Sequence, residues 1–418
     1  EPARSSLSRR LVLAGAVVLV AIAAGVAAYV VHVRQAGRSV VGSPTVEFHP
    51  TPTPKPVIRK AGAITWPTYG RGAARLRAVD GVGIRPPFRR VWTWHGRALL
   101  EFPPVVADGR LFLSTFDGRF YALDARTGRA LWRWDSHRCG WASPAIAGPL
   151  VIEAFIGHAC ALDVPGQDGE VVAFERRTGA IRWRRTVGPT ETSPLVVHGL
   201  VYVGDWSGRV TALDAGTGRT RWTYRAGGAL KSSPTLAGGL VVIGAYDGHV
   251  YALAARTGRL VWRASSQPRL GSQGSFYSTP AAAYDRIYIG STDGKMYSFG
   301  AETGRLRWSH ATGGYVYAAP AVWRQLVLVG SYDHVFYAFD AATGATRWSF
   351  HANGPISGAA SVVDGVVYFS TFAHLTYALS AATGRLLWTW PDGEYSPVVT
   401  DGRRIYLTGR GRIYGLVR

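Results

Sequence analysis

Signatures of several enzyme classes are missing from this sequence. It shows no Ser-His-Asp arrangement, no glycine-rich phosphate loop and no metalloprotease helix. Charged residues make up only 17% of the chain, whereas 51 of its 418 residues are glycine. This composition suits short strands joined by tight turns and disfavours a helical or a disordered protein. We therefore expect a folded, turn-rich β protein.

Lysine is scarce and accounts for only four of the 47 basic residues. The formal net charge is nevertheless +21. Nucleic-acid binding draws on basic side chains that neutralise phosphates and that gather in stripes or runs. Here the arginines recur singly in turns and at strand ends, as in Thr127-Gly128-Arg129 and Thr217-Gly218-Arg219. The sequence therefore predicts no nucleic-acid partner.

Cysteine occurs only twice, in His137-Arg138-Cys139 and in His158-Ala159-Cys160. An even cysteine count in an extracytoplasmic domain favours a disulfide between Cys139 and Cys160. Two His-x-Cys pairs could instead form a tetrahedral metal site, although zinc sites have other spacings, and both thiols could also be buried and free. We predict the disulfide and no metal site.

Tryptophan, in contrast, is abundant and periodic. One position recurs with successive gaps of 40, 51, 39, 40, 46, 40 and 40 residues, at Trp92, Trp132, Trp183, Trp222, Trp262, Trp308, Trp348 and Trp388. Self-similarity at about 40 to 50 residues is the signature of a repeat architecture. We expect each indole to fill the gap between neighbouring sheets, with its N–H on a backbone acceptor, in preference to forming an aromatic binding ladder.

Each repeat contains four short apolar runs separated by turns. A two-residue turn such as Asp117-Gly118 or Asp247-Gly248 joins the second run to the third, because these residues tolerate positive φ. A Thr-Gly pair joins the third run to the fourth, and in four repeats a carboxylate three residues earlier, as at Asp214, can accept backbone N–H groups of the turn. The repeat therefore predicts a four-stranded blade.

The last repeat is incomplete. It ends at Arg418 after three strands, whereas residues 89–94 match a fourth strand that has no three strands before it. Pairing these two fragments closes a ring and removes open sheet edges. The sequence thus predicts an all-β fold: an eight-bladed β-propeller of four-stranded blades over residues 63–418, whose last blade is closed by the N-terminal strand.

The Asp-x-x-Thr-Gly-x-x-x-Trp motif, which recurs over residues 85–418, resembles the pyrroloquinoline-quinone (PQQ)-type β-propeller repeat. That family includes quinoprotein dehydrogenases and non-enzymatic propellers similar to BamB of the bacterial outer-membrane assembly machinery. WD-repeat propellers fit less well, because Trp134-Asp135 is the only Trp-Asp pair. The adjacent cysteines and long active-site insertions of several quinoprotein dehydrogenases are absent. The resemblance implies a protein-binding or scaffolding propeller without a cofactor; the alternative is a PQQ- and Ca²⁺-dependent dehydrogenase of alcohols or sugars.

The N-terminal segment contains an uncharged apolar run over residues 11–31, long enough to cross a hydrocarbon core of about 30 Å as a helix. Because arginines lie on both sides of this run, the charges predict its orientation in the membrane only weakly. The alternative interpretation is a cleavable signal peptide. We expect a single-pass anchor in the cell membrane, with residues 1–10 in the cytoplasm. A Pro/Thr-rich spacer over residues 32–62 would then carry the propeller outside the cytoplasm.

Function in a propeller is expected at the mouth of the central channel, where loops vary on a rigid scaffold. One repeat position, two residues before each Ser-Pro or its equivalent, is expected there: Glu101, Trp141, Glu191, Lys231, Tyr277, Tyr317, Ser357 and Glu394. These residues form either solvated, paired rim charges or a polar site for a ligand or a partner's peptide, and none is predicted to be catalytic. Under the dehydrogenase alternative, the three glutamates would supply a base and Ca²⁺ ligands, and the aromatic residues would stack on the cofactor.

Overall fold

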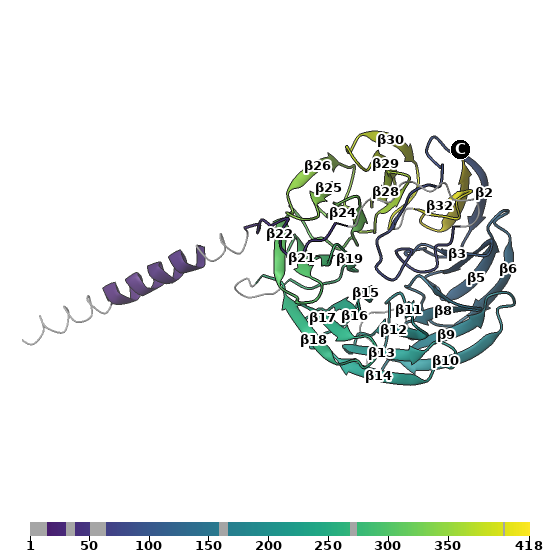
Figure 1. Cartoon of the computed structure of the whole chain (residues 1–418), viewed down its shortest axis with the longest axis horizontal. Coiled ribbons are helices and arrows are strands. Elements are labelled where there is room, and N and C mark those ends of the chain that lie inside the picture. Colours follow the sequence, from purple (N-terminus) through teal and green to yellow (C-terminus); the bar gives the residue numbers. More distant parts are fainter. Residues whose placement is uncertain (1–14, 31–37, 51–63, 159–165, 268–273, 396–397) are drawn as a thin grey trace, which may run out of the picture.

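The computed structural model describes residues 15–30, 38–50, 64–158, 166–267, 274–395 and 398–418. Eight twisted antiparallel sheets are arranged around a central axis in the described part of the chain, as Figure 1 shows. The first strand of each sheet lies innermost, beside the first strands of its neighbours. The predicted eight-bladed propeller is confirmed.

Seven blades are contiguous in the sequence, and we number them from the first. Blade 1 consists of β3 (Val105–Ala107), β4 (Arg110–Ser114), β5 (Arg119–Asp124) and β6 (Ala130–Asp135); blade 2 of β7 (Ala145–Ala147), β8 (Leu150–Phe155), β9 (Gly169–Glu175) and β10 (Ile181–Val187); blade 3 of β11 (Leu195–Val197), β12 (Leu200–Gly204), β13 (Arg209–Asp214) and β14 (Thr220–Arg225); blade 4 of β15 (Thr235–Ala237), β16 (Leu240–Gly244), β17 (His249–Ala254) and β18 (Leu260–Ser265). Blade 5 consists of β19 (Ala281–Ala283), β20 (Arg286–Gly290), β21 (Lys295–Gly300) and β22 (Leu306–Ala311); blade 6 of β23 (Ala321–Trp323), β24 (Leu326–Gly330), β25 (Val335–Asp340) and β26 (Thr346–His351); blade 7 of β27 (Ser361–Val363), β28 (Val366–Ser370), β29 (Thr376–Ser380) and β30 (Leu386–Trp390).

Blade 8 is assembled from both ends of the propeller. It consists of β31 (Val398–Thr400), β32 (Ile405–Thr408), β33 (Arg412–Val417) and the N-terminal strand β2 (Arg89–His95). β2 pairs antiparallel with β33, in a register that places Trp94 opposite Ile413. The predicted closure of the ring by the N-terminal strand is confirmed, and it leaves no blade with an incomplete sheet.

Six of the eight repeated tryptophans lie between blades with the indole N–H on a carbonyl oxygen, as expected, whereas the N–H of Trp92 is buried without a hydrogen-bond partner among the described residues. Trp308 of blade 5 is fully buried, and its indole N–H donates to the carbonyl oxygen of Ala341 in blade 6 at 2.9 Å. A Cβ atom at Gly344 would lie 2.7 Å from the same indole, and this glycine also has a positive φ of 75°. The glycine of the Thr-Gly turn therefore has two roles. It adopts the positive φ of the turn, and its missing side chain leaves room for the indole of the preceding blade. The same indole–carbonyl bond recurs for Trp132, Trp183, Trp222, Trp262 and Trp348.

The central channel is filled by the chain itself, which the sequence did not predict. Residues 64–84 run along the inner strands, and we call this segment the plug. Trp66 exchanges two backbone hydrogen bonds of 2.9 Å with Val106 of β3. Carbonyl groups of the plug accept backbone N–H bonds from the inner strands of blades 2, 4, 5, 6 and 7. Within it, β1 (Ala78–Val79) adds a fifth, parallel strand to blade 7.

Two buried arginines fasten the plug inside the channel. The Arg75 guanidinium donates to the carbonyl oxygens of Tyr69, of Pro234 at 2.6 Å and of Ser193 at 2.9 Å. Arg77 donates to the carbonyl oxygens of Arg75 and Pro320, at 2.7 and 3.2 Å, and lies 4.6 Å from the ring centroid of Tyr69. Burial lowers the pKa of Arg75 to about 9, with a further contribution from Arg77, so both the charge and its hydrogen bonds are present at neutral pH.

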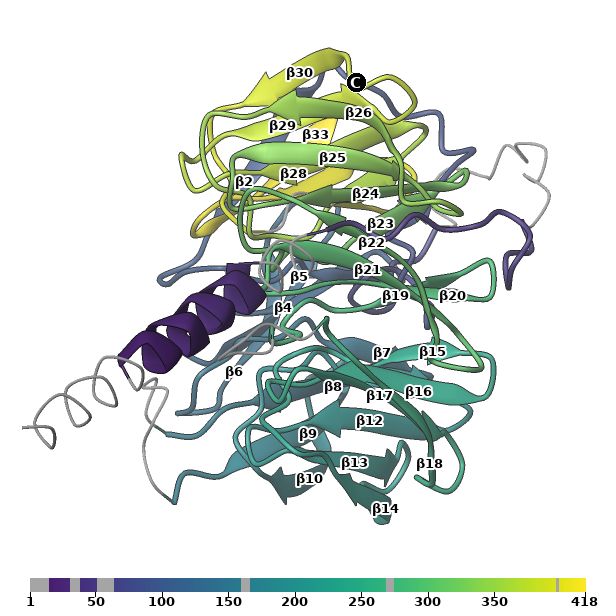
Figure 2. The same cartoon turned by 90° about the vertical axis from the view of Figure 1, so that its left-hand side faces the viewer.

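A second N-terminal segment, residues 38–50, packs against blade 5. It falls inside the predicted spacer 32–62, but it is docked from Val40, which forms a β-bridge with Ser309 of β22, to His49, which pairs with Asp285 at 2.5 Å. The Arg286 guanidinium donates to the carbonyl oxygens of Ser43, Val46 and Glu47 within 3.0 Å. The trace of this segment beside β22 is visible in Figure 2. Residues 51–63 of the predicted spacer lie outside the described residues.

The carboxylate of Glu47 replaces one that blade 5 lacks. In blade 3, Asp214 accepts hydrogen bonds from the Thr217 turn and pairs with Arg221 at 2.7 Å. Blade 5 has Gly300 at that position, and a Cβ atom there would lie 1.8 Å from the Glu47 carboxylate. Glu47 instead accepts from Thr303 and pairs with Arg307 at 2.6 Å. The docked segment therefore completes the motif of blade 5 from a distant part of the sequence.

The predicted transmembrane span is not supported by the structure. A helix over residues 15–30 projects from the propeller (Figure 1), and its side chains are exposed. Among the described residues, no helix is both long enough and apolar enough to cross a membrane. Residues 11–14 and 31, the two ends of the predicted span, lie outside the described residues, as does the N-terminal segment 1–10.

Cys139 is fully buried, and it does not carry a free thiol. Cys160 lies outside the described residues, so its pairing with Cys139 stays a prediction. Peptide mass analysis of the protein, alkylated with and without reductant, should show a Cys139–Cys160 crosslink that disappears on reduction. Two alkylatable thiols in the unreduced native protein would contradict it.

Candidate functional site

The mouth of the channel lies on the face of the turns between second and third strands, and five predicted rim residues meet there around one cavity. Its volume is about 50 Å³, and Tyr69 of the plug forms part of its lining. The predicted residues that line it are Glu101, Lys231, Tyr277, Tyr317 and Ser357. Trp141, Glu191 and Glu394 do not line the cavity. Instead Trp141 packs against Phe116 with the two rings tilted, Glu191 lies 3.6 Å from Lys231, and Glu394 pairs with Arg410 at 3.4 Å.

Aromatic rings run around the mouth, and we call this array the aromatic belt. From Phe116 to Trp141 and Trp206 the ring centroids are 5.2 and 6.5 Å apart. The Lys231 ammonium then lies 4.7 Å from the Trp206 centroid and 5.4 Å from that of Tyr246. The belt continues at centroid separations of 5.1 to 6.2 Å through Tyr246, Tyr277, Tyr317, Tyr332, Phe372 and Tyr395.

Six of the nine rings of the belt were not predicted from the sequence: Tyr395, which follows the predicted Glu394, and five rings from another repeat position. Phe116, Trp206, Tyr246, Tyr332 and Phe372 share one repeat position, the first residue of the turn between second and third strands. In the sequence, turns such as Asp117-Gly118, Ser207-Gly208 and Asp247-Gly248 are explained by their geometry alone, so the aromatic residue beside them attracts no functional interpretation. The recurrence of an aromatic residue at the first position of this turn was the signal that could have found them. Tyr69 had no such signal, since the plug carries no repeat.

The electrostatics of the mouth are set by three carboxylates and one ammonium group. Burial raises the pKa of Glu101 from 4.5 to about 8; Glu191 and Glu394 raise it further and Lys231 opposes them. Burial also raises the pKa of Glu191 to about 7, against the opposing effect of Lys231. A carboxyl group held near neutrality among aromatic rings can donate as well as accept a hydrogen bond. The indole N–H group of Trp141 is buried without a hydrogen-bond partner among the described residues.

The raised pKa of Glu101 predicts a pH dependence of stability. Between about pH 4.5 and 8 the folded state holds this proton more tightly than the unfolded state. The resulting stabilisation is fully present below about pH 4.5 and is lost as the pH rises through 8. We therefore expect Glu101→Gln to flatten the fall in stability over this window and to raise the free energy of unfolding at alkaline pH by more than roughly 1 kcal/mol.

Urea unfolding at several pH values measures this effect. Glu302→Gln is the matched control, since Glu302 is exposed on the opposite face, in a Thr-Gly turn. Parallel pH profiles for the Glu101→Gln variant and the unmodified protein would contradict the prediction.

The mouth does not fit the cofactor and cation of the dehydrogenase alternative. Sites for drug-sized ligands occupy about 300 to 1,000 Å³, far more than the cavity beside Tyr69. The plug fills the channel below it. Throughout the described part of the chain, no three His, Cys, Asp or Glu side chains cluster so that they could hold a metal ion. Glu101, Glu191 and Glu394 thus form no common ligand set.

Comparison with known proteins agrees with the repeat motif. Residues 89–166, 167–312 and 246–361 match a family model described as outer membrane protein assembly factor BamB, and together they cover more than half of the chain. The chain belongs to this family. The resemblance drawn from the Asp-x-x-Thr-Gly-x-x-x-Trp motif is therefore confirmed, and the protein is a BamB-like, PQQ-type β-propeller.

Curated relatives of the BamB-like propeller have different functions. The chain is 30% identical to the serine/threonine-protein kinase AfsK of Streptomyces griseus, over 38% of this chain and 20% of the kinase. It is 32% identical to BamB of Bordetella pertussis, over 31% of each chain. It is 30% identical to the quinohemoprotein alcohol dehydrogenase ADH-IIG of Pseudomonas putida, over 30% of this chain and 19% of the enzyme. The chain thus spans less than a third of the length of each of these relatives.

Solved structures show the same fold at low identity. BamB from Moraxella catarrhalis superposes with a TM-score of 0.64 and 18% identity, over 79% of this chain and all of that one. The ADHIIG dehydrogenase from Pseudomonas putida superposes with a TM-score of 0.71 and 14% identity, over 85% and 80% of the two chains. Because the BamB-like fold carries both kinds of protein, function has to be argued from the mouth itself.

Proposed function

We propose that this propeller is a protein-binding or scaffolding module whose binding surface is the mouth of the channel. The aromatic belt carries the proposal, because it surrounds a small cavity with a mixed polar and apolar lining, over a channel that the plug closes. Exposed Tyr246 and Tyr315 lie beside half-buried rings, an arrangement that offers large apolar area at low entropic cost. Lys231 and the carboxylates would fix the orientation of a partner.

Site-specific photo-crosslinking tests this proposal. A photoreactive residue at Tyr315 or Tyr246 should capture the same partner in cells, whereas one at exposed Leu387 on an outer strand should not. Tyr277→Ala, which interrupts the belt, should reduce capture from Tyr315. Equal capture from Leu387 and Tyr315, or capture unaffected by Tyr277→Ala, would contradict a mouth-centred surface. The proposal includes no nucleic-acid partner.

The cellular placement belongs to the same proposal. We infer that residues 11–31 hold the protein in a membrane with the propeller outside the cytoplasm. The support is the helix over residues 15–30, whose exposed side chains include Val17, Leu19, Val20 and Ile22, because a helix that is apolar all round is stable only when buried or in a bilayer. A C-terminal reporter that works only outside the cytoplasm should be active and membrane-bound. A soluble, inactive reporter would refute the placement.

The dehydrogenase alternative has a separate test. Addition of PQQ with Ca²⁺ should give no bound-cofactor absorbance and no dye-linked oxidation of alcohols or sugars. Turnover under these conditions would replace the binding proposal with the enzymatic one.

A further inference from the structure

The docked segment 38–50 shows how this propeller binds an extended peptide. Phe48 enters a groove between blades 5 and 6, where it packs with Tyr284, Tyr288 and Ala341. The preceding Glu47 pairs with Arg307 at the edge of the groove. The groove is formed by the turn between first and second strands and by the Thr-Gly turns, on the face opposite the mouth, which we call the lower face.

Equivalent grooves follow from the repeat, and one lies between blades 2 and 3. Trp183 donates to the carbonyl oxygen of Ala215, as Trp308 does to that of Ala341, so these two alanines are equivalent. Leu150 lies opposite Glu175, as Arg286 lies opposite Gly300. Arg182 directly precedes its blade's tryptophan, as Arg307 does.

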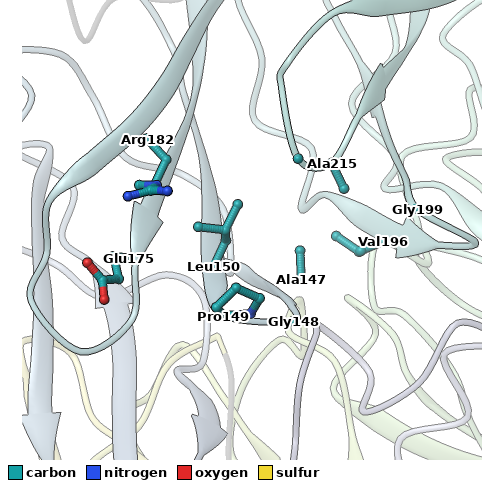
Figure 3. A pocket seen from close by; sticks show the side chains of 10 residues that line it. Ala147, Gly148, Pro149, Leu150, Glu175, Arg182, Val196, Gly199 and Ala215 are labelled. Atoms are coloured by element: carbon teal, nitrogen blue, oxygen red, sulfur yellow. The ribbon is translucent and has the colours of Figure 1, made fainter.

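This groove between blades 2 and 3 is open and largely apolar. Its volume is about 530 Å³, and Figure 3 shows Leu150, Pro149 and Ala147 on one side and Val196 and Ala215 on the other. Arg182 and Glu175 stand together at its edge in the same view. Glu175 accepts a hydrogen bond from Thr178 at 2.9 Å, and Arg182 is exposed and makes no ion pair within the described part of the chain. At the same repeat position in other blades, ion pairs are formed by Arg221, Arg307 and Arg347.

We propose that the groove between blades 2 and 3 binds an extended peptide segment of a partner protein, with an aromatic side chain over Leu150 and Ala215 and a preceding acidic residue on Arg182. This order, an acidic residue followed by an aromatic one, is the order of Glu47 and Phe48 in the docked segment. This groove has Leu150 where the groove between blades 5 and 6 has Arg286. It is therefore more apolar, which favours an aromatic side chain of the partner, but it lacks at this position a guanidinium group that could donate hydrogen bonds to the carbonyl groups of the peptide. Glu175 fills the space that Gly300 leaves open, so the partner's carboxylate approaches Arg182 from the solvent side.

A labelled peptide tests this site on the full chain. The probe is a fluorescein-labelled peptide with the sequence of residues 42–50, titrated by fluorescence anisotropy. Saturable binding is expected, and a peptide with alanine in place of Phe48 should bind about tenfold more weakly, because it loses its apolar anchor. A peptide with lysine in place of Glu47 should bind about fivefold more weakly, and added salt should narrow that difference.

Protein variants locate the binding. Gly216→Trp should weaken binding at least about tenfold by filling the groove, since a Cβ atom at Gly216 meets only Asp214 Oδ1 at 3.6 Å and the backbone there accepts a side chain. Arg182→Glu should weaken binding about fivefold. Arg385→Glu makes the same charge change at an exposed site in blade 7 and should leave binding unchanged.

Three outcomes would overturn the proposal. The first is no saturable binding to the unmodified chain. The second is undiminished binding to a Gly216→Trp variant that unfolds at the same temperature as the parent. The third is binding that appears only after Phe48→Ala vacates the groove between blades 5 and 6, which would mean that the peptide exchanges with residues 38–50.

Discussion

Replacing Arg75 with alanine is expected to lower the free energy of unfolding of the propeller by about 3 to 5 kcal/mol. The guanidinium is fully buried and joins three carbonyl oxygens, of Tyr69, Ser193 and Pro234, that belong to the plug and to two different blades. Its removal leaves those acceptors unpaired in the channel. Urea unfolding measures the loss, and Arg129→Ala, at an exposed turn, is the control.

Arg75→Lys should not restore the lost stability, because a single ammonium group cannot reach acceptors that the planar guanidinium fork joins in three directions. A loss below about 1 kcal/mol for Arg75→Ala would contradict the fastening role of this residue. It would also mean that the backbone bonds of the plug hold the channel closed without it.

The second large effect is expected at Trp308. Trp308→Ala should cost about 3 to 5 kcal/mol, because the side chain is fully buried and its removal leaves a cavity between blades 5 and 6. Trp348 occupies the same repeat position with the same indole–carbonyl bond to Ala381, but it is only half-buried. Trp348→Ala should therefore cost about 1 to 3 kcal/mol.

Thermal and urea unfolding of the two variants compare equivalent positions within one chain. Equal losses would mean that burial at this position does not set the contribution of the indole. A larger loss at Trp348 would overturn the packing argument.

The blades and their closure were predictable because each depends on a local motif. The Thr-Gly turn and the tryptophan recur in the sequence, and the fragment around Trp92 completes a strand that the C-terminal repeat lacks. The rim positions followed from the same alignment. Contacts that obey the period were accessible from the sequence, but the aromatic position at the start of the turn between second and third strands, which is also periodic, was overlooked.

The plug was not predictable for the opposite reason. Residues 64–84 carry no repeat, and their hydrogen bonds go mostly to backbone groups, which leave no complementary side chain in the sequence. One irregularity did signal the docked segment. Blade 5 keeps Arg307 but has Gly300 where blades 3 and 6 have an aspartate, so an external carboxylate was to be expected. Its source, Glu47, could not be deduced from spacing.

The docking of residues 38–50 shortens the link between helix and propeller. The predicted spacer has 31 residues, but Ser39 already accepts a hydrogen bond from Ala311, at the end of β22 that points to the mouth face. Only residues 31–37 then separate the helix from the propeller, and they can span at most roughly 30 Å. Any surface that holds the helix would therefore lie within roughly 30 Å of the mouth face of the propeller. A partner that binds at the mouth would have to enter from the side, between that surface and the propeller, or be located on that surface itself.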